Sequence, residues 1–224
     1  MTHTEPYKTI LVGGAFQSSH QSSASEHITN ANITLVERFK SHWSGIEEQA
    51  CHLVASIQKI EMPVRVIGHS LGALVAYRAH QLASAGIIPR TVLMNCGSIG
   101  EPMPFQTGVV CNPMNMLFGW MSMLRNQESI LALQEASLGH VQIGDRTDGL
   151  IMLAGANDQV IPRGFSERTA KRIRARLIML HGGHNLLDDD EGGDLLEVVM
   201  KWFDTGTGLR QLPNLIPQRN LVTS

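Results

Sequence analysis

The sequence lacks any uninterrupted apolar stretch that approaches the roughly 20 residues needed to cross a lipid bilayer. Neither sign of charge dominates, since the formal net charge is −2, and this gives no electrostatic reason to expect a nucleic acid or an anionic membrane as a partner. The first residues, MTHTEPYKTILVGG, contain no basic segment followed by a long apolar one, so we expect no signal peptide. These absences favour a cytoplasmic protein without a membrane span.

Cysteine is scarce, and the three cysteines, Cys51, Cys96 and Cys111, include no pair in a CxxC spacing. This predicts small buried or semi-buried thiols in a reducing compartment. Hydrophobic residues make up 43% of the chain and charged residues 17%, a balance typical of a folded globular protein. With 224 residues, the chain is long enough for one domain with a substantial core and short for two.

Short apolar runs alternate with longer amphipathic ones, which is typical of parallel strands joined by helices. Strands are predicted at residues 9–12, 32–36, 64–67, 91–94, 150–153 and 176–180. Helices are predicted at residues 44–60, 70–85, 163–172 and 188–203, the first with Ser44 as its candidate cap and the last opening on the acidic run DDDE. The pattern predicts an α/β fold, a mostly parallel central sheet flanked by helices. We expect one domain over residues 1–204, followed by an extended tail at 205–224.

The segment from about residue 98 to 147 breaks this alternation because it contains no clear strand. It is rich in methionine, with Phe118, Trp120 and Met121 among its large apolar residues. Loops of this length are uncommon in compact domains unless they are lids or other functional excursions, so we predict a mostly helical cap over one end of the sheet. A second interpretation is that these side chains form a core beneath the insertion, which flexible methionines fill well. The two interpretations are compatible.

One serine stands where a predicted strand gives way to a predicted helix. In the stretch VRVIGHSLGALVAYRAH, Ser70 lies between Gly68 and Gly72. A G-x-S-x-G motif in this context predicts a tight, strained turn that projects the serine hydroxyl into a cleft at the positive end of the helix. The two glycines leave the space that such a turn needs. A glycine-rich turn with an ordinary serine explains the motif alone equally well, because five residues often match by chance.

Two further residues fall where parallel strands end. Asp158 follows the predicted strand at 150–153, and His184 follows the one at 176–180. The carboxyl ends of parallel strands share one rim of the sheet, so both side chains are expected near Ser70. A serine nucleophile needs a base, and the base needs an acid that orients it. Each residue alone is also explained as a loop cap or a surface histidine, but their joint placement favours a Ser-His-Asp triad.

Other titratable residues near these motifs are assigned lesser roles. His69 adjoins the serine, but adjacent side chains in such a turn point apart, so we expect it to pack or to support its neighbours. Asp145 and Asp148 precede their strand and are expected at the opposite rim. His181 forms an HxxH pair with the later histidine, but the pair straddles a strand end and has no evident third ligand. We therefore predict no metal site.

Taken together, these motifs make the chain resemble a small α/β-hydrolase. The resemblance covers roughly residues 9–203 and rests on four motifs: LVGGAF, GHSLG, AGANDQVIP and HGGHN. It implies the α/β-hydrolase fold, with the cap inserted after the fourth core strand. It also implies an oxyanion hole of two backbone N–H groups, one from Leu71 and one from Ala15 or Phe16. The family's frequent His-Gly pair is replaced here by two glycines, which leaves the register of the second donor open.

The activity implied is hydrolysis of a small-molecule ester or thioester through an acyl-enzyme, with no cofactor. The chain resembles stand-alone thioesterases and small carboxylesterases, so an acyl carrier protein is a candidate partner. Phe118, Trp120 and Met121 are expected to bind an apolar acyl group. Two alternatives remain. The same fold also hosts lyases and cofactor-independent oxygenases, and the chain is also explained as a non-catalytic binding protein, against which the complete triad argues.

Overall fold

The computed structural model describes residues 7–14, 28, 31–36, 44–103, 130–187 and 192–209. Six strands form its central sheet: β1 (Lys8–Val12), β2 (Ile33–Val36), β3 (Val64–His69), β4 (Thr91–Met94), β5 (Leu150–Gly155) and β6 (Arg176–Leu180). The helices are α2 (Ile46–Ile57), α3 (Leu71–Leu82), α5 (Ile130–Leu138), α6 (Arg163–Arg172) and α7 (Gly192–Thr205). The predicted alternation of strands and helices is confirmed.

The strands lie in the order β2-β1-β3-β4-β5-β6, and every neighbouring pair is parallel. The chain passes from β1 to β2 on one side and then returns to place β3 on the other side of β1. The direction of strand addition therefore reverses between β1 and β3. In open parallel sheets, ligands bind beyond the carboxyl ends of the strands at such a reversal. Ser70 directly follows β3, so it lies at this point.

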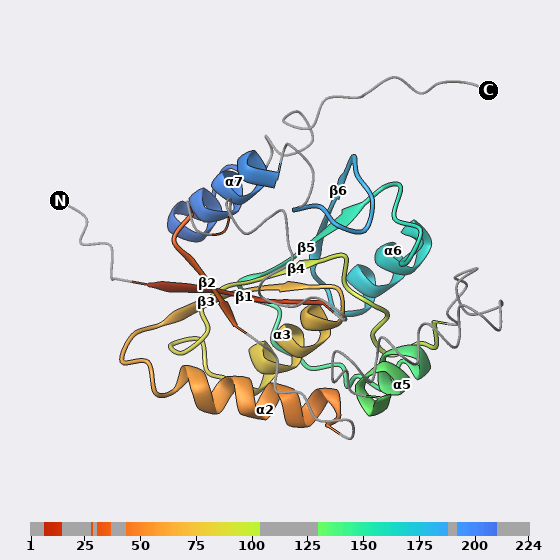
Figure 1. The fold of residues 1–224 in the computed structure, drawn as a ribbon, viewed down its shortest axis with the longest axis horizontal. Helices are drawn as coiled ribbons and strands as arrows, with labels where there is room; N and C mark the ends of the chain where they lie inside the picture. The colour runs from red at the N-terminus through yellow and green to blue at the C-terminus, as the bar shows by residue number, and fades with distance from the viewer. Residues whose placement is uncertain are drawn as a thin grey trace.

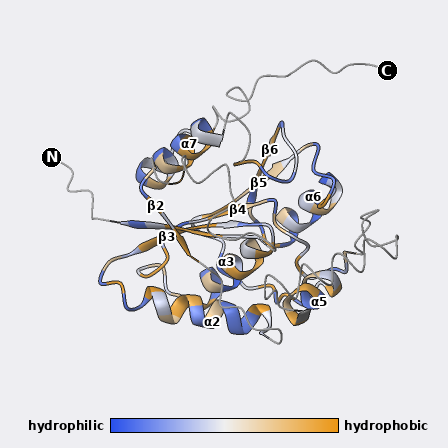
Figure 2. Cartoon of the chain, viewed as in Figure 1, coloured by the Kyte–Doolittle hydropathy of each residue, from blue (hydrophilic) through white to orange (hydrophobic). Residues whose placement is uncertain are grey.

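Helices cover both faces of the sheet (Figure 1). Successive strand residues point to opposite faces, so Val66 joins the core shared with α2 and α3, while Ile67 joins the core shared with α7. Residues of α5 and α6 also belong to the first core. Because both faces are buried, the strands read as nearly continuous apolar runs, and Figure 2 shows hydrophobic colours along the sheet and mixed colours on the helices. These runs are the reason that the strands were predictable.

The N-terminus of α2 is capped in a way that the sequence did not predict. The helix begins at Ile46 with Gly45 as its N-cap residue, and Gly45 has no side chain to offer. The backbone N–H of Ile46 instead donates to Glu135 Oε2 at 2.6 Å, across 89 positions of sequence. The prediction of Ser44 as the cap was therefore wrong. A Cβ at Gly45 would lie 2.7 Å from Glu135 Oε1, so the glycine makes room for the carboxylate.

The ends of two other helices also differ from their predictions. Helix α3 ends at Leu82, three residues before the predicted end, where Ala83 adopts an extended conformation. Helix α7 is described from Gly192 and continues to Thr205, two residues past its predicted end. The acidic run at 188–191 lies outside the described residues.

The long insertion lies between the fourth and fifth strands, as expected, and the structure describes its two ends. Helix α5 belongs to the later end and packs against α2 and α3. At the earlier end, Glu101 forms ion pairs with Arg168 and Arg172 of α6, at 2.7 and 2.8 Å. Both ends are thus attached to helices that line one face of the sheet. Residues 104–129 lie outside the described part of the chain, so the helical cap stays a prediction.

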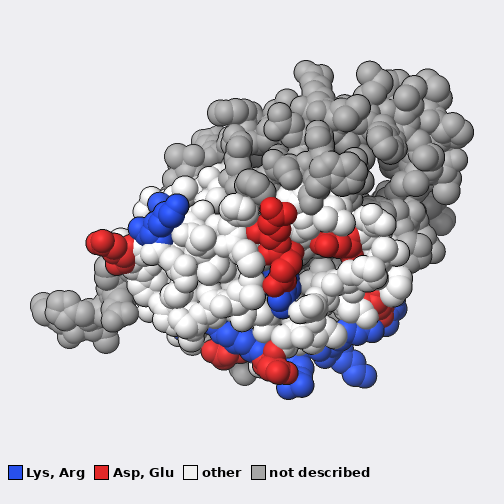
Figure 3. All heavy atoms as spheres, turned by 90° about the horizontal axis from the view of Figure 1, so that it is seen from below, with Lys and Arg blue, Asp and Glu red and all other residues white. Residues whose placement is uncertain are grey.

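Charges of both signs lie close together on the surface that is seen from below in Figure 1 (Figure 3). An ion pair joins α2 and α3, where Arg78 of α3 donates from Nε to Glu47 of α2 at 2.7 Å. Neighbouring opposite charges offset one another, in keeping with the small net charge of the sequence. In the parts of the chain that the structure describes, none of the helices combines the length and the apolar character needed to cross a bilayer.

Candidate active site

Ser70 occupies a strained turn between β3 and α3. Its backbone has φ 53° and ψ −121°, a conformation that costs a non-glycine residue about 1–3 kcal/mol. A Cβ at Gly68 would lie 2.6 Å from the Cβ of Ala76, and one at Gly72 would lie 2.3 Å from the carbonyl oxygen of Gly13. Real Cβ atoms do not approach other atoms so closely. The two glycines thus let the helix start directly against the ends of β1 and β3, as the sequence predicts.

Asp158 is fixed in the loop that follows β5. Its Oδ1 accepts hydrogen bonds from the backbone N–H groups of Val160 and Ile161, at 2.8 and 2.9 Å. Its Oδ2 lies 2.9 Å from Nδ1 of His184. The side chain is 1% exposed, so water contributes little to its solvation. With Oδ1 held by the local turn, Oδ2 is left facing the imidazole.

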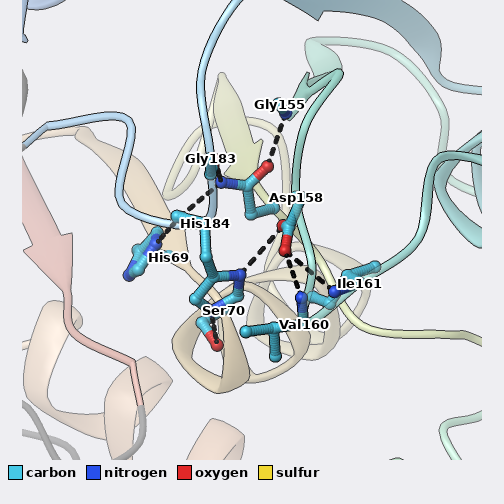
Figure 4. Close-up of polar contacts among 9 residues, drawn as sticks. His69, Ser70, Gly155, Asp158, Val160, Ile161, Gly183 and His184 are labelled. Carbon is cyan, nitrogen blue, oxygen red and sulfur yellow. Dashed lines mark hydrogen bonds and ion pairs between the residues drawn. The ribbon is translucent and has the colours of Figure 1, made fainter. Parts of the chain in front are cut away.

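His184 lies between the carboxylate and the serine (Figure 4). Its Nε2 is 2.9 Å from Ser70 Oγ, and its Nδ1 is 2.9 Å from Asp158 Oδ2. A carboxylate only accepts hydrogen bonds, so the network assigns the ring proton to Nδ1 and leaves Nε2 to accept from the serine hydroxyl. The structure therefore brings the three sequence-predicted side chains together in the order Ser, His, Asp. Their catalytic role stays a prediction.

Of the three candidate donors for an oxyanion hole, the structure describes one. Leu71 is the first residue of α3, and the first N–H groups of a helix have no acceptor within the helix. Ala15 and Phe16 lie outside the described residues. The loop that contains them leaves β1 at Gly13, whose carbonyl lies directly against the start of α3. The cap candidates Phe118, Trp120 and Met121 also lie outside the described residues.

The rival acids lie elsewhere. Asp148 immediately precedes Gly149, whose carbonyl accepts from the first residue of β4, so it lies at the amino end of the sheet. It pairs with Arg146 at 3.8 Å and is 73% exposed. Asp145 lies in the same connection, also before β5. Within the described residues, no three histidine, cysteine or carboxylate side chains are grouped so that they could hold a metal ion.

Sequence reasoning did not find Asn95, which directly follows β4 at the same rim. Asn95 lies in the segment MNCGSIG, which contains no carboxylate and therefore no candidate for the acid of a triad. A polar residue at the carboxyl end of a central, fully buried strand is the signal that could have singled it out. Asn95 is completely buried and contacts the segments that carry Asp158 and His184.

Comparisons with known proteins add information on the fold. No family model matches the sequence, and no curated protein matches it. Among solved structures, an α/β-hydrolase enzyme from a sediment metagenome of the Mar Chica lagoon in Morocco superposes with a TM-score of 0.60 at 14% identity. The match covers 89% of this chain and 92% of that one. The chain has the α/β-hydrolase fold.

Two other structures with this fold are also similar. YbtT, a type II thioesterase from the yersiniabactin NRPS/PKS biosynthetic pathway, gives a TM-score of 0.60 at 14% identity and covers 97% of this chain and 96% of its own. A monoacylglycerol lipase from Paleococcus ferrophilus gives 0.62 at 13% identity, covering 90% and 95%. The order of Ser70, Asp158 and His184 along the sequence is the one expected of a triad on an α/β-hydrolase sheet.

Proposed function

We propose that the protein is a serine hydrolase that cleaves a carboxylic ester or thioester. The observation that carries the proposal is the hydrogen-bonded chain from Ser70 Oγ through the His184 imidazole to Asp158. These three hydrogen-bonded side chains lie at the reversal of the strand order, where this type of sheet binds its ligands. Ser70 acts as the nucleophile, His184 as the general base and acid, and Asp158 as the group that orients the imidazole.

The reaction follows from the positions of the protons. His184 Nε2 takes the hydroxyl proton while Ser70 Oγ bonds to the substrate carbonyl carbon, and Asp158 stabilises the imidazolium that forms. His184 then gives this proton to the departing alcohol or thiol, leaving an acyl-enzyme. Water attacks the acyl-enzyme in the second half, and His184 again takes and returns a proton. Ser70 is regenerated and the carboxylic acid is released.

The tetrahedral intermediate carries a negative oxygen that needs donors in place before it forms. The N–H of Leu71, at the positive end of α3, is the first proposed donor. The second is the N–H of Ala15 or Phe16, which follow β1 in sequence. Removing one such donor from a hydrolase costs on the order of 10²–10³ in kcat.

The substrate that we propose is an apolar acyl group, carried as an ester or thioester. The similar structures include a thioesterase and a lipase, which supports testing both bond types. If the substrate is a thioester, an acyl carrier protein is the partner that we propose for its delivery.

Active-site labelling combined with a substrate panel tests this function. The protein is treated with a fluorophosphonate probe and assayed with acyl-CoA, carrier-bound acyl groups and p-nitrophenyl esters. We expect stoichiometric labelling of Ser70 and turnover of at least one class, and the ratio of thioester to ester kcat/KM then assigns the bond type. A lyase or oxygenase with the same triad would be labelled without hydrolysing the panel. A binding protein would show neither.

A further prediction concerns the insertion. Trp120→Gln and Met121→Gln should lower kcat/KM for an octanoyl ester relative to an acetyl ester by about tenfold or more, since lost apolar contacts penalise the longer chain. The measurement is the octanoyl-to-acetyl ratio, variant against parent. Met62→Gln, at an exposed site before β3, is the matched control and should leave the ratio unchanged. An unchanged ratio in the Trp120 and Met121 variants would mean that these residues only pack the insertion.

A further inference from the structure

The backbone carbonyl of His184 is held by two side chains that the mechanism above does not use. Its oxygen accepts a hydrogen bond from Nδ2 of Asn95 and lies 2.8 Å from Nε2 of His69. His69 ends β3 and Asn95 follows β4, so the two central strands each supply one donor. The carbonyl carbon is bonded to the Cα that carries the imidazole. Fixing this peptide therefore restricts the direction in which the imidazole leaves the backbone.

Asn95 also ties this peptide to the strand that leads to the acid. Its Oδ1 accepts from the N–H of Gly155 at 2.8 Å, and its Nδ2 donates to the carbonyl of Gly183 at 3.1 Å as well as to that of His184. The side chain is 0% exposed, and the backbone has φ 45°, a region that asparagine tolerates better than most residues. Gly155 lies three residues before Asp158. One amide group thus connects the end of β5, which leads into the acid loop, with the histidine loop.

His69 approaches the same peptide from the side of the nucleophile. It is 4% exposed, and its ring centroid lies 5.2 Å from that of His184. A carbonyl can only accept, so the contact assigns a proton to Nε2 of His69. Figure 4 shows the ring of His69 beside the His184 segment. His69 adjoins Ser70 in sequence, so its hydrogen bond connects the serine turn to the histidine loop.

We propose that Asn95 and His69 are positioning residues that aim the imidazole of His184 at Ser70 through its carbonyl. This inference rests on the proposed function, because it assigns the residues a role in that reaction. A backbone hydrogen bond from Asn157 to the Gly182 carbonyl, at 3.0 Å, also joins the two loops, but it does not hold the His184 peptide. Reaction rates are sensitive to such aiming, since a displacement of about 1 Å can cost on the order of 100-fold in rate.

A matched pair of variants at His69 tests the role of its donor. His69→Phe keeps a ring of similar size but cannot donate, and we expect kcat to fall about tenfold with KM changed by less than about twofold, because the reacting geometry is lost while the binding surface remains. His69→Gln places an amide nitrogen near the position of Nε2 and should restore kcat to within about threefold of the parent. Equal kcat in the phenylalanine variant and the parent, or equal losses in both variants, would overturn the assignment.

Asn95→Asp tests the second donor. The substitution keeps the shape, the tolerance of positive φ and the acceptor for Gly155, but it replaces the amide donor with oxygens that face two carbonyls. We expect kcat to fall by up to about 100-fold, again with little change in KM. In the double variant with His69→Phe, the losses should not add, because both donors act on one carbonyl. Parent-like kcat in a folded Asn95→Asp protein would contradict the proposal. If that protein does not fold, the His69 pair decides alone.

A measurement that needs no turnover separates this inference from the proposed function. The proton between His184 Nδ1 and Asp158 gives a downfield NMR resonance, which Asp158→Asn removes and so assigns. We expect it to shift or broaden in His69→Phe and to recover in His69→Gln. A parent protein that neither reacts with fluorophosphonate nor hydrolyses the panel, yet shows this pattern, would retain the positioning role and lose the proposed function. A resonance that is identical in all His69 variants would remove the positioning role, whatever the activity.

Discussion

Ser70→Ala will abolish fluorophosphonate labelling and lower hydrolysis by roughly a millionfold, to the level left by binding and oxyanion contacts alone. The serine oxygen is the atom that His184 Nε2 contacts, and alanine offers nothing for the imidazole to deprotonate. The turn itself tolerates the change. The N–H of Ser70 still donates to the Met94 carbonyl, at 2.9 Å, and alanine presents the same Cβ at φ 53°.

The measurements are the labelled fraction, kcat with the preferred substrate and the thermal unfolding midpoint of the variant. We expect the midpoint to stay within a few degrees of the parent, which separates loss of the nucleophile from loss of the fold. Ser56→Ala is a matched control, since Ser56 is an exposed serine on α2 whose hydroxyl donates only within its own helix. Near-parent turnover by Ser70→Ala would end the serine hydrolase proposal.

Asp158→Asn should lower kcat by about 10⁴-fold while the protein stays folded, because the wrong imidazole tautomer is favoured. The local turn decides which way the new amide faces. The N–H groups of Val160 and Ile161 require an acceptor, so the amide oxygen takes the place of Oδ1. The NH₂ group then faces Nδ1 of His184, which must accept rather than donate. The ring proton moves to Nε2, where it blocks the proton transfer from Ser70.

Asp148→Asn is the control for this prediction, because Asp148 lies at the other end of the same strand and is 73% exposed. The kcat of Asp148→Asn should stay within about twofold of the parent, as expected for a surface substitution away from the site. The comparison is made on kcat at a fixed pH near 8, with the unfolding midpoint as a check on folding. A mild Asp158→Asn together with a damaging Asp148→Asn would show that the acid has been misassigned.

The strands and the three central side chains were predictable for related physical reasons. Parallel strands buried on both faces must be apolar along their length, so they appear as short runs of Val, Ile and Leu. Once the strands are located, the residues that follow them share a rim, and Ser70, Asp158 and His184 each follow a strand directly or after a short loop. Few other residues at this rim could form a triad, because it needs a hydroxyl nucleophile, a base that takes its proton and a carboxylate that orients the base.

The supporting contacts were not predictable in the same way. His69 and the His184 carbonyl are 115 positions apart, and a backbone carbonyl leaves no trace in the residue types. Asparagine is a common turn residue, so Asn95 does not stand out in the sequence. Only the three-dimensional structure shows that its amide forms hydrogen bonds with Gly155 and His184. The cap of α2 was assigned to the nearest serine because local capping is the common case, whereas Glu135 supplies it from the insertion.

That cap limits how freely the insertion can be exchanged. Glu135 accepts a hydrogen bond from the first turn of α2, and Gly45 leaves the space that its carboxylate occupies. The helix cap is therefore formed jointly by the core and the insertion. A chimera that carries the corresponding insertion of another protein with this fold would leave the Ile46 amide without its acceptor and a void beside Gly45. Such a graft would need its own carboxylate at this place, or an aspartate at position 45 to cap the helix locally. The insertion is thus an integral part of the scaffold and not an interchangeable module.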